Sequence, residues 1–264
     1  SLAPIPTTRL VTCVCWLLCI IPLSFGFFIP LGVLLRFVLL GDLAAEFLAV
    51  QPLIINTVAV AIAAALFIML VASIIVLTAA FRAGSRLRKL ALISSTGYAF
   101  PGTILAIGVL IYASYIDGFL RLMSGGMISS FLIAGMGLLM LAYLVRFQAV
   151  GYGAMLSGVR RLPKNLMSAS RVLGHGYGAS LKQIILPLLK SSFLAGLLLV
   201  FVDIMKELPM TLLLRPFDFE TLATHTYQFA KDEMLEKASL PALMIVMTGL
   251  IPVILMSAML RRYR

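Results

Sequence analysis

Three charged residues stand close together inside a long apolar stretch of this sequence. Asp203, Lys206 and Glu207 are spaced at i, i+3 and i+4, so a continuous helix would carry them on one face. An ionised side chain near the middle of a membrane costs about 2.5–3.5 kcal/mol on insertion scales, so these residues are expected to face protein or water. They could line or latch a path for a solute, or Lys206 could pair with an acid on its own helix and only fix packing. Pro209 follows and would kink the helix, which suits a gate.

The composition places these charges in a membrane protein. Apolar residues make up 62% of the 264 residues and charged residues only 12%, with a mean hydropathy of +1.10. A soluble protein of this length would need far more polar surface. The net charge of +11 is therefore interpreted through membrane topology, and no nucleic-acid partner is expected.

Six segments are long and apolar enough to cross the membrane, which takes roughly 20 residues in a helix. They lie at about 10–35, 53–80, 91–115, 128–150, 188–213 and 240–260. Pro22 and Pro30 are expected to kink the first segment or split it. The sequence thus predicts an all-α membrane protein with six transmembrane helices.

The distribution of lysine and arginine predicts the orientation of these helices. A cytoplasmic N-terminus puts most basic residues on the cytoplasmic side: Arg9, Arg82, Arg86, Arg88, Lys89, Arg160, Arg161, Lys164, Arg171, Lys182, Lys190, Arg261, Arg262 and Arg264. No acidic residue falls in those segments. Both termini are therefore expected in the cytoplasm.

Two connections are longer than turns. The connection at 214–239 is expected outside, with an amphipathic helix between Phe219 and Phe229. The coupling loop, about 160–187, is expected inside. It contains a predicted short helix at 166–173 and a second at 179–186, with Pro187 opening the next span. Between these helices stand three alternating glycines, Gly174, Gly176 and Gly178, which allow a sharp change of direction.

The coupling loop resembles the coupling segment of importer-type ABC permeases. That segment has Glu-Ala-Ala, three residues, Gly, nine residues, Ile, one residue and Leu-Pro. The matching positions here are Ala169, Ser170, Gly174, Ile184, Leu186 and Pro187, with Ser168 in place of the glutamate. The resemblance implies a type I importer permease fold in which this loop docks an ATPase. Because the carboxylate is missing, docking is expected to depend on shape, apolar contact and basic residues.

Further stretches resemble the permeases of ferric-iron importers. They are 97–102 (Gly-Tyr-Ala-Phe-Pro-Gly), 203–209 (Asp-Ile-Met-Lys-Glu-Leu-Pro), 212–216 and 219–224. Such permeases are often fusions of two six-span halves, and this chain resembles a C-terminal half. The resemblance therefore implies one permease domain over 1–264 that translocates ferric iron across a bacterial inner membrane.

The same resemblance implies the partners. They are a cytoplasmic ABC ATPase dimer, a second permease domain, a periplasmic binding protein and membrane lipid. The chain carries no GxxxxGK[ST] motif, so it is expected to be no enzyme, to bind no cofactor and to leave ATP to its partner. Oxygen ligands for iron are sought among Tyr98, Tyr112, Tyr115 and Tyr143, although aromatic residues at span ends are commonly interfacial anchors. The position of any metal site is left open.

Other functions fit part of this pattern. An ABC permease for a polyamine, thiamine or an inorganic anion would keep the same fold and coupling loop. A secondary transporter driven by an ion gradient would show unwound helices or repeat symmetry and would leave the basic loop unexplained. A membrane assembly factor without transport activity is a third alternative.

Overall fold

The computed structural model describes residues 8–41, 43–81, 89, 91–124, 135–163 and 165–262. Within these ranges all regular structure is helical. The elements are α1 (Arg9–Leu23), α2 (Ile29–Leu40), α3 (Leu43–Phe81), α5 (Gly102–Met123), α6 (Met136–Arg160), α7 (Leu166–Val172), α8 (Tyr177–Ser180), α9 (Leu186–Met205), α10 (Pro209–Leu214), α11 (Leu222–Lys231) and α12 (Leu235–Arg262). Three short turns complete them: the π-helical turns η1 (Ser24–Phe28) and η3 (Leu181–Ile185), and the 3₁₀ turn η2 (Gly97–Ala99).

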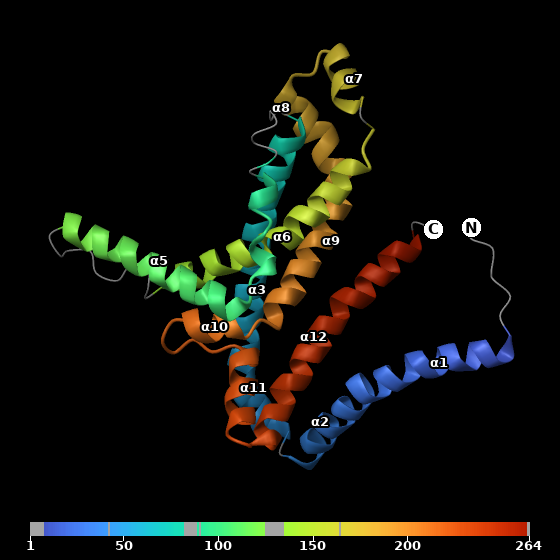
Figure 1. Ribbon diagram of the computed structural model, residues 1–264, viewed down its shortest axis with the longest axis vertical. Coiled ribbons are helices and arrows are strands. Elements are labelled where there is room, and N and C mark those ends of the chain that lie inside the picture. Colours follow the sequence, from blue (N-terminus) through green and yellow to red (C-terminus); the bar gives the residue numbers. More distant parts are fainter. Residues whose placement is uncertain are drawn as a thin grey trace.

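The centre of the molecule is formed by α3, α6 and α9, which pack side by side (Figure 1). Small residues allow their close approach, as is usual between membrane helices. A Cβ atom on Gly196 of α9 would lie 2.7 Å from Cε of Met69 on α3 and 2.8 Å from Cβ of Ala154 on α6. Larger residues at Gly196 would therefore push the three helices apart.

The two long connections lie at opposite ends of the molecule. Figure 1 shows α7 and α8 at one end of the long axis and α11 near the other. This arrangement fits the expectation that the coupling loop and the 214–239 connection face opposite sides of a membrane. The amphipathic helix expected in the latter connection is confirmed as α11.

Five described helical stretches are long and apolar enough to span a membrane: Arg9–Leu40, Glu46–Phe81, Gly102–Met123, Met136–Arg160 and Tyr177–Met205. The sixth predicted span, 240–260, lies within α12, and its crossing stays a prediction. The first stretch, α1 to α2, leads away from the bundle, and no residue of α1 is buried.

Several predicted spans have wrong boundaries. The helix of the second begins earlier, at Leu43, and the helix of the fourth ends later, at Arg160. The third was expected at 91–115, but its helix begins only at Gly102, because Gly97 and Pro101 interrupt the chain before it. The fifth was expected at 188–213, but α9 ends at Met205 and a separate α10 starts at Pro209. Proline lacks the N–H that a helix interior needs, so it is accommodated at the first position of a new helix.

Candidate functional site: the coupling loop and the Glu207 cluster

The first half of the coupling loop is a short helix closed by a left-handed glycine. α7 carries Ser168, Ala169 and Ser170, and Gly174 follows it at φ +83°. His175 N–H donates to the carbonyl of Ser170 at 3.1 Å and Gly174 N–H donates to that of Arg171 at 3.0 Å. These two bonds form a Schellman cap, in which glycine avoids the steric penalty that a side chain would meet. The predicted turn at Gly174 is thus confirmed.

A buried hydroxyl pair ties α7 to α8. The Oγ atoms of Ser170 and Ser180 lie 2.6 Å apart, and the two residues are 2% and 1% exposed. The Ser180 hydroxyl also lies 3.0 Å from the carbonyl oxygen of Gly176. These hydrogen bonds therefore hold α7 and α8 together at the corner of the loop.

The outer face of this corner is apolar and basic. Val172 is 87% exposed and Leu173 is 76% exposed, and Arg171 beside them is exposed too. This pair of adjacent exposed apolar side chains is available for contact with another protein. Ser168 and Ala169 are exposed on the same short helix.

The second half of the loop does not form a separate short helix. α8, η3 and α9 are continuous from Tyr177 to Met205. Within this stretch the N–H of Leu186 donates to the carbonyl of Leu181, five residues back, and Pro187 comes next. The wider turn relieves the clash that the Pro187 ring would make with the preceding helical turn. Of the remaining motif positions, Ile184 is half-buried, while Leu186 and Pro187 are exposed.

At the other end of this helix, Glu207 caps α10. Its carboxylate accepts the backbone N–H groups of Met210 at 3.1 Å and Thr211 at 3.2 Å. The residue is only 6% exposed. A carboxylate at a helix N-terminus satisfies free N–H groups and the positive end of the helix dipole. Glu207 therefore stabilises the break between α9 and α10.

Three residues from other elements complete what we call the Glu207 cluster: Arg146, Tyr143 and Thr211. Nη1 of Arg146 lies 3.4 Å from Oε1 of Glu207. The Thr211 hydroxyl donates to the backbone carbonyl of Glu207 at 2.9 Å, which leaves its oxygen to accept from the Tyr143 hydroxyl at 2.5 Å. The cluster joins α6 to the break.

Two glycines make room for this arrangement. A Cβ atom on Gly102 would overlap Nη1 of Arg146, and one on Gly97 would overlap the carbonyl oxygen of Val145. Both glycines thus allow the 97–102 segment to pass directly against α6. The packing explains why this stretch requires glycine at both ends.

The charged triad expected on one helical face is not formed. Lys206 and Asp203 pair at 3.0 Å near the end of α9, and the Lys206 side chain is 62% exposed. Glu207 lies beyond the end of α9 and contacts α6 and α10 instead. Pro209 does not kink a continuous helix but is the first residue of α10.

Arg146 was missed by the sequence reasoning. It is the one basic residue in the interior of the predicted 128–150 span, and such a charge is expected to have a polar partner. Its position was therefore a usable signal. Of the tyrosines considered as iron ligands, Tyr143 is buried in the Glu207 cluster, whereas Tyr98, Tyr112 and Tyr115 are exposed. Among the described residues, no three His, Cys, Asp or Glu side chains are grouped to hold a metal ion.

A second polar cluster anchors the 214–239 connection. The Glu220 carboxylate lies 3.0 Å from Nη1 of Arg215 and 3.3 Å from Nδ1 of His225. Partial burial by itself would raise the pKa of Glu220, but hydrogen bonds and charges from Arg215 and His225 outweigh it and lower this pKa below its usual value. The Thr57 hydroxyl on α3 accepts the N–H of Leu222 at 2.8 Å, which fixes the start of α11.

The helical bundle thus carries a capped corner with an exposed apolar face at one end and a partly buried ion pair, and comparisons with known proteins identify its class. Residues 74–264 match the family of inner membrane components of binding-protein-dependent transport systems. The chain belongs to this family, whose members are multi-pass permease components of ABC transporters and not enzymes.

One relative of this chain is the Fe(3+)-transport system permease protein FbpB 2 of Haemophilus influenzae. It is 23% identical to this chain over 159 residues. The match covers 60% of this chain and 29% of the relative. It supports the resemblance to ferric-iron permeases, while this chain spans less than a third of the relative's length.

Proposed function

We propose that this chain is one permease domain of an ATP-driven importer, most simply one for ferric iron. A binding protein outside delivers the substrate, and a cytoplasmic ATPase dimer docks on the coupling loop. A second permease domain completes the pathway, and both termini of this chain lie in the cytoplasm. The observation that carries the proposal is the continuous helix from Tyr177 to Met205, which joins the docking corner to the Glu207 cluster.

This helix is suited to transmit motion. At 1.5 Å per residue its 29 residues extend roughly 43 Å, which exceeds the hydrocarbon thickness. Its first turns are bound to α7 through the serine pair, and its last residue precedes the break that Glu207 stabilises. Movement of the corner by an ATPase would therefore reach the opposite end of the molecule.

Docking is tested by removing the two exposed apolar side chains of the corner. The double variant Val172→Ser/Leu173→Ser should weaken ATPase binding at least tenfold, because burial of such an apolar side chain contributes about 1.5–3 kcal/mol and two are removed. Binding is measured in detergent with the purified ATPase. Phe217→Ser is a matched control, since Phe217 is 98% exposed near the other end of the molecule. Equal affinity of the double variant and the wild type would refute docking at this corner.

The substrate is tested by uptake into vesicles that contain the whole transporter, its ATPase and its binding protein. Ferric iron supplied with the binding protein should be taken up only when ATP is present. Uptake that does not depend on iron supply or on the binding protein would refute the iron assignment while leaving the ATPase-docking result intact.

An anionic substrate is a second candidate because of Arg146. Its side chain is 22% exposed, and its Nε atom has no hydrogen-bond partner among the described residues. A guanidinium with unused donors is suited to an oxyanion. Sulfate or phosphate uptake in the same vesicles, lost in Arg146→Lys, would favour this alternative over iron.

A further inference from the structure

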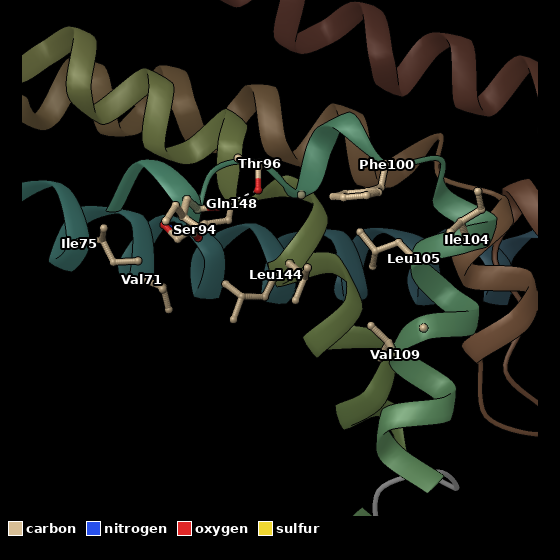
Figure 2. Close-up of a pocket in the computed structure, with 14 residues that line it drawn as sticks. Val71, Ile75, Ser94, Thr96, Phe100, Ile104, Leu105, Val109, Leu144 and Gln148 are labelled. Carbon is tan, nitrogen blue, oxygen red and sulfur yellow. Dashed lines mark hydrogen bonds between the residues drawn. The ribbon is translucent and has the colours of Figure 1, made fainter. Parts of the chain in front are cut away.

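A pocket of about 590 Å³ lies between α3, α6 and the segment that leads into α5 (Figure 2). Its wall is mainly apolar and includes Val71, Ile75, Phe100, Leu105 and Leu144. The volume lies within the range of roughly 300–1,000 Å³ that is usual for small-molecule sites. The pocket is separate from the docking corner and from the polar contacts of Glu207.

Gln148 of α6 contributes an unpaired amide to this pocket. The residue is 3% exposed, and neither its Oε1 nor its Nε2 has a hydrogen-bond partner among the described residues. A buried amide without partners is costly, so its retention calls for a ligand group. Two hydroxyls share the lining. Ser94 donates to the carbonyl of Ala91 at 2.8 Å and Thr96 to that of Ile93 at 2.9 Å, so both oxygens remain free to accept.

These groups define the chemistry of an occupant. Among the described residues, no charged side chain lines the pocket, so they would compensate neither a metal ion nor an anion. The Gln148 amide carries a hydrogen-bond donor, its NH₂ group, beside an acceptor, its carbonyl oxygen. A ligand group that pairs with both must itself carry an acceptor beside a donor. The remaining lining residues are apolar, so the rest of the bound molecule must be apolar too.

The uncharged lining narrows the class of occupant further. A phospholipid headgroup carries charge, which no described residue of the pocket compensates. An uncharged molecule with a single small head and an apolar chain matches both the amide and the apolar wall.

We propose that this pocket binds a neutral single-headed amphiphile, either a primary fatty amide or a protonated fatty acid, with its head on Gln148 and its chain along the apolar wall. Both molecules present a carbonyl acceptor beside an N–H or O–H donor. The site is independent of the transported substrate and of the ATPase.

Photolabelling in membranes that contain the full chain with its partner domains tests the site. The probes are dodecanamide and dodecanoic acid that carry a diazirine in the chain, with a diazirine-bearing dodecane as the headless control. At least one of the two headed probes should label residues of the 93–109 or 144–148 segments at least fivefold more than the headless control. Labelling by the amide alone or the acid alone identifies the head. Labelling no stronger than that of the exposed helix α1 overturns the proposal, as does complete exclusion by a neighbouring permease domain.

Two variants separate recognition by Gln148 from general lipid contact. Gln148→Leu keeps the volume and should reduce headed-probe labelling at least fivefold, while raising the melting temperature of the ligand-free protein. Gln228→Leu, an exposed substitution in α11, is the matched control and should leave labelling unchanged. Gly108→Leu should block the pocket with the amide intact, since a Cβ there meets nothing within 4 Å. Undiminished labelling in both pocket variants contradicts the proposal.

Discussion

Lys206 and Glu207 are neighbours in the chain but occupy opposite environments. The Lys206 side chain is 62% exposed and pairs with Asp203 on its own helix, whereas the Glu207 side chain is 4% exposed and joins α6 to α10. The first is a local pair of the kind that contributes little to stability. The second is a tertiary contact whose loss leaves charges and N–H groups unpaired.

A helix end can thus place two adjacent charged residues in different environments and give them different structural roles. Because α9 stops at Met205, the chain turns and carries Glu207 into the interior. Had the helix continued, the two residues would have been about 100° apart on the same surface.

The largest effect is expected for Glu207→Ala. It removes the cap of α10 and leaves Arg146 without its carboxylate, which should lower the free energy of unfolding by about 3 kcal/mol. Chemical denaturation in detergent micelles measures this change. A double-mutant cycle with Arg146→Ala isolates the pair, and additive losses would show that the 3.4 Å contact contributes nothing.

Gly102→Ala should act on the same pair from α5. The new methyl group would displace the Arg146 guanidinium from Glu207, at a cost of about 2 kcal/mol. Gly108→Ala on the same helix is the control, since nothing lies within 4 Å of its Cβ position, and it should be neutral or stabilising. Equal behaviour of the two alanine variants in thermal melts would contradict the close approach at Gly102.

Tyr143→Phe should have a smaller effect. The Thr211 hydroxyl loses one donor but keeps its bonds to Glu207, so the expected loss is about 1 kcal/mol. Chemical denaturation of the variant in micelles measures this loss. A loss as large as that of Glu207→Ala would mean that the tyrosine hydroxyl, rather than the carboxylate, organises the cluster.

Glu220 is intermediate in exposure, and its contribution should depend on pH. Because its pKa is lowered in the folded protein, it stabilises the fold above the ordinary glutamate pKa of about 4.3, and this contribution is lost as the pH falls through the folded value. Wild type should therefore be more stable than Glu220→Gln at pH 6, with the difference vanishing on acidification. A difference that grows on acidification would contradict the lowered pKa.

The smallest effect is expected for Lys206→Ala. Its pair with Asp203 is largely solvated, so stability should change by less than about 0.5 kcal/mol. The same denaturation assay measures this variant beside Glu207→Ala. A loss comparable with that of Glu207→Ala would remove the contrast between the two neighbours.

Local features were predictable from the sequence. The α7 helix, the left-handed turn at Gly174 and the amphipathic α11 each depend on residues within a few positions of one another. Glycine and the helical period of apolar residues are sufficient to specify such elements. The ATPase-docking role of the coupling loop stays a prediction. The exposed corner of the loop is compatible with this role.

Long-range features were not predictable. Pro209 marks the break after Met205 in the sequence, but the buried position of Glu207 depends on its contact with Arg146, a residue 61 positions earlier in the chain. The hydropathy of 188–213 favours one uninterrupted span and does not predict this contact. Gly97 and Gly102 belong to a stretch that resembles ferric-iron permeases. Glycine is needed at both positions because α6 passes directly against them.

The π-turn before Pro187 has a consequence for angular phase. A π-turn contains one residue more than an α-helical turn. If this extra residue moved to another position in the helix, the residues between the two positions would rotate by about 100° about the helix axis. Pro187 has no N–H to offer to an ordinary helical turn, so the insertion is pinned at Leu181–Ile185. The position of Pro187 therefore fixes the direction in which Asp203 points relative to the corner formed by α7 and α8.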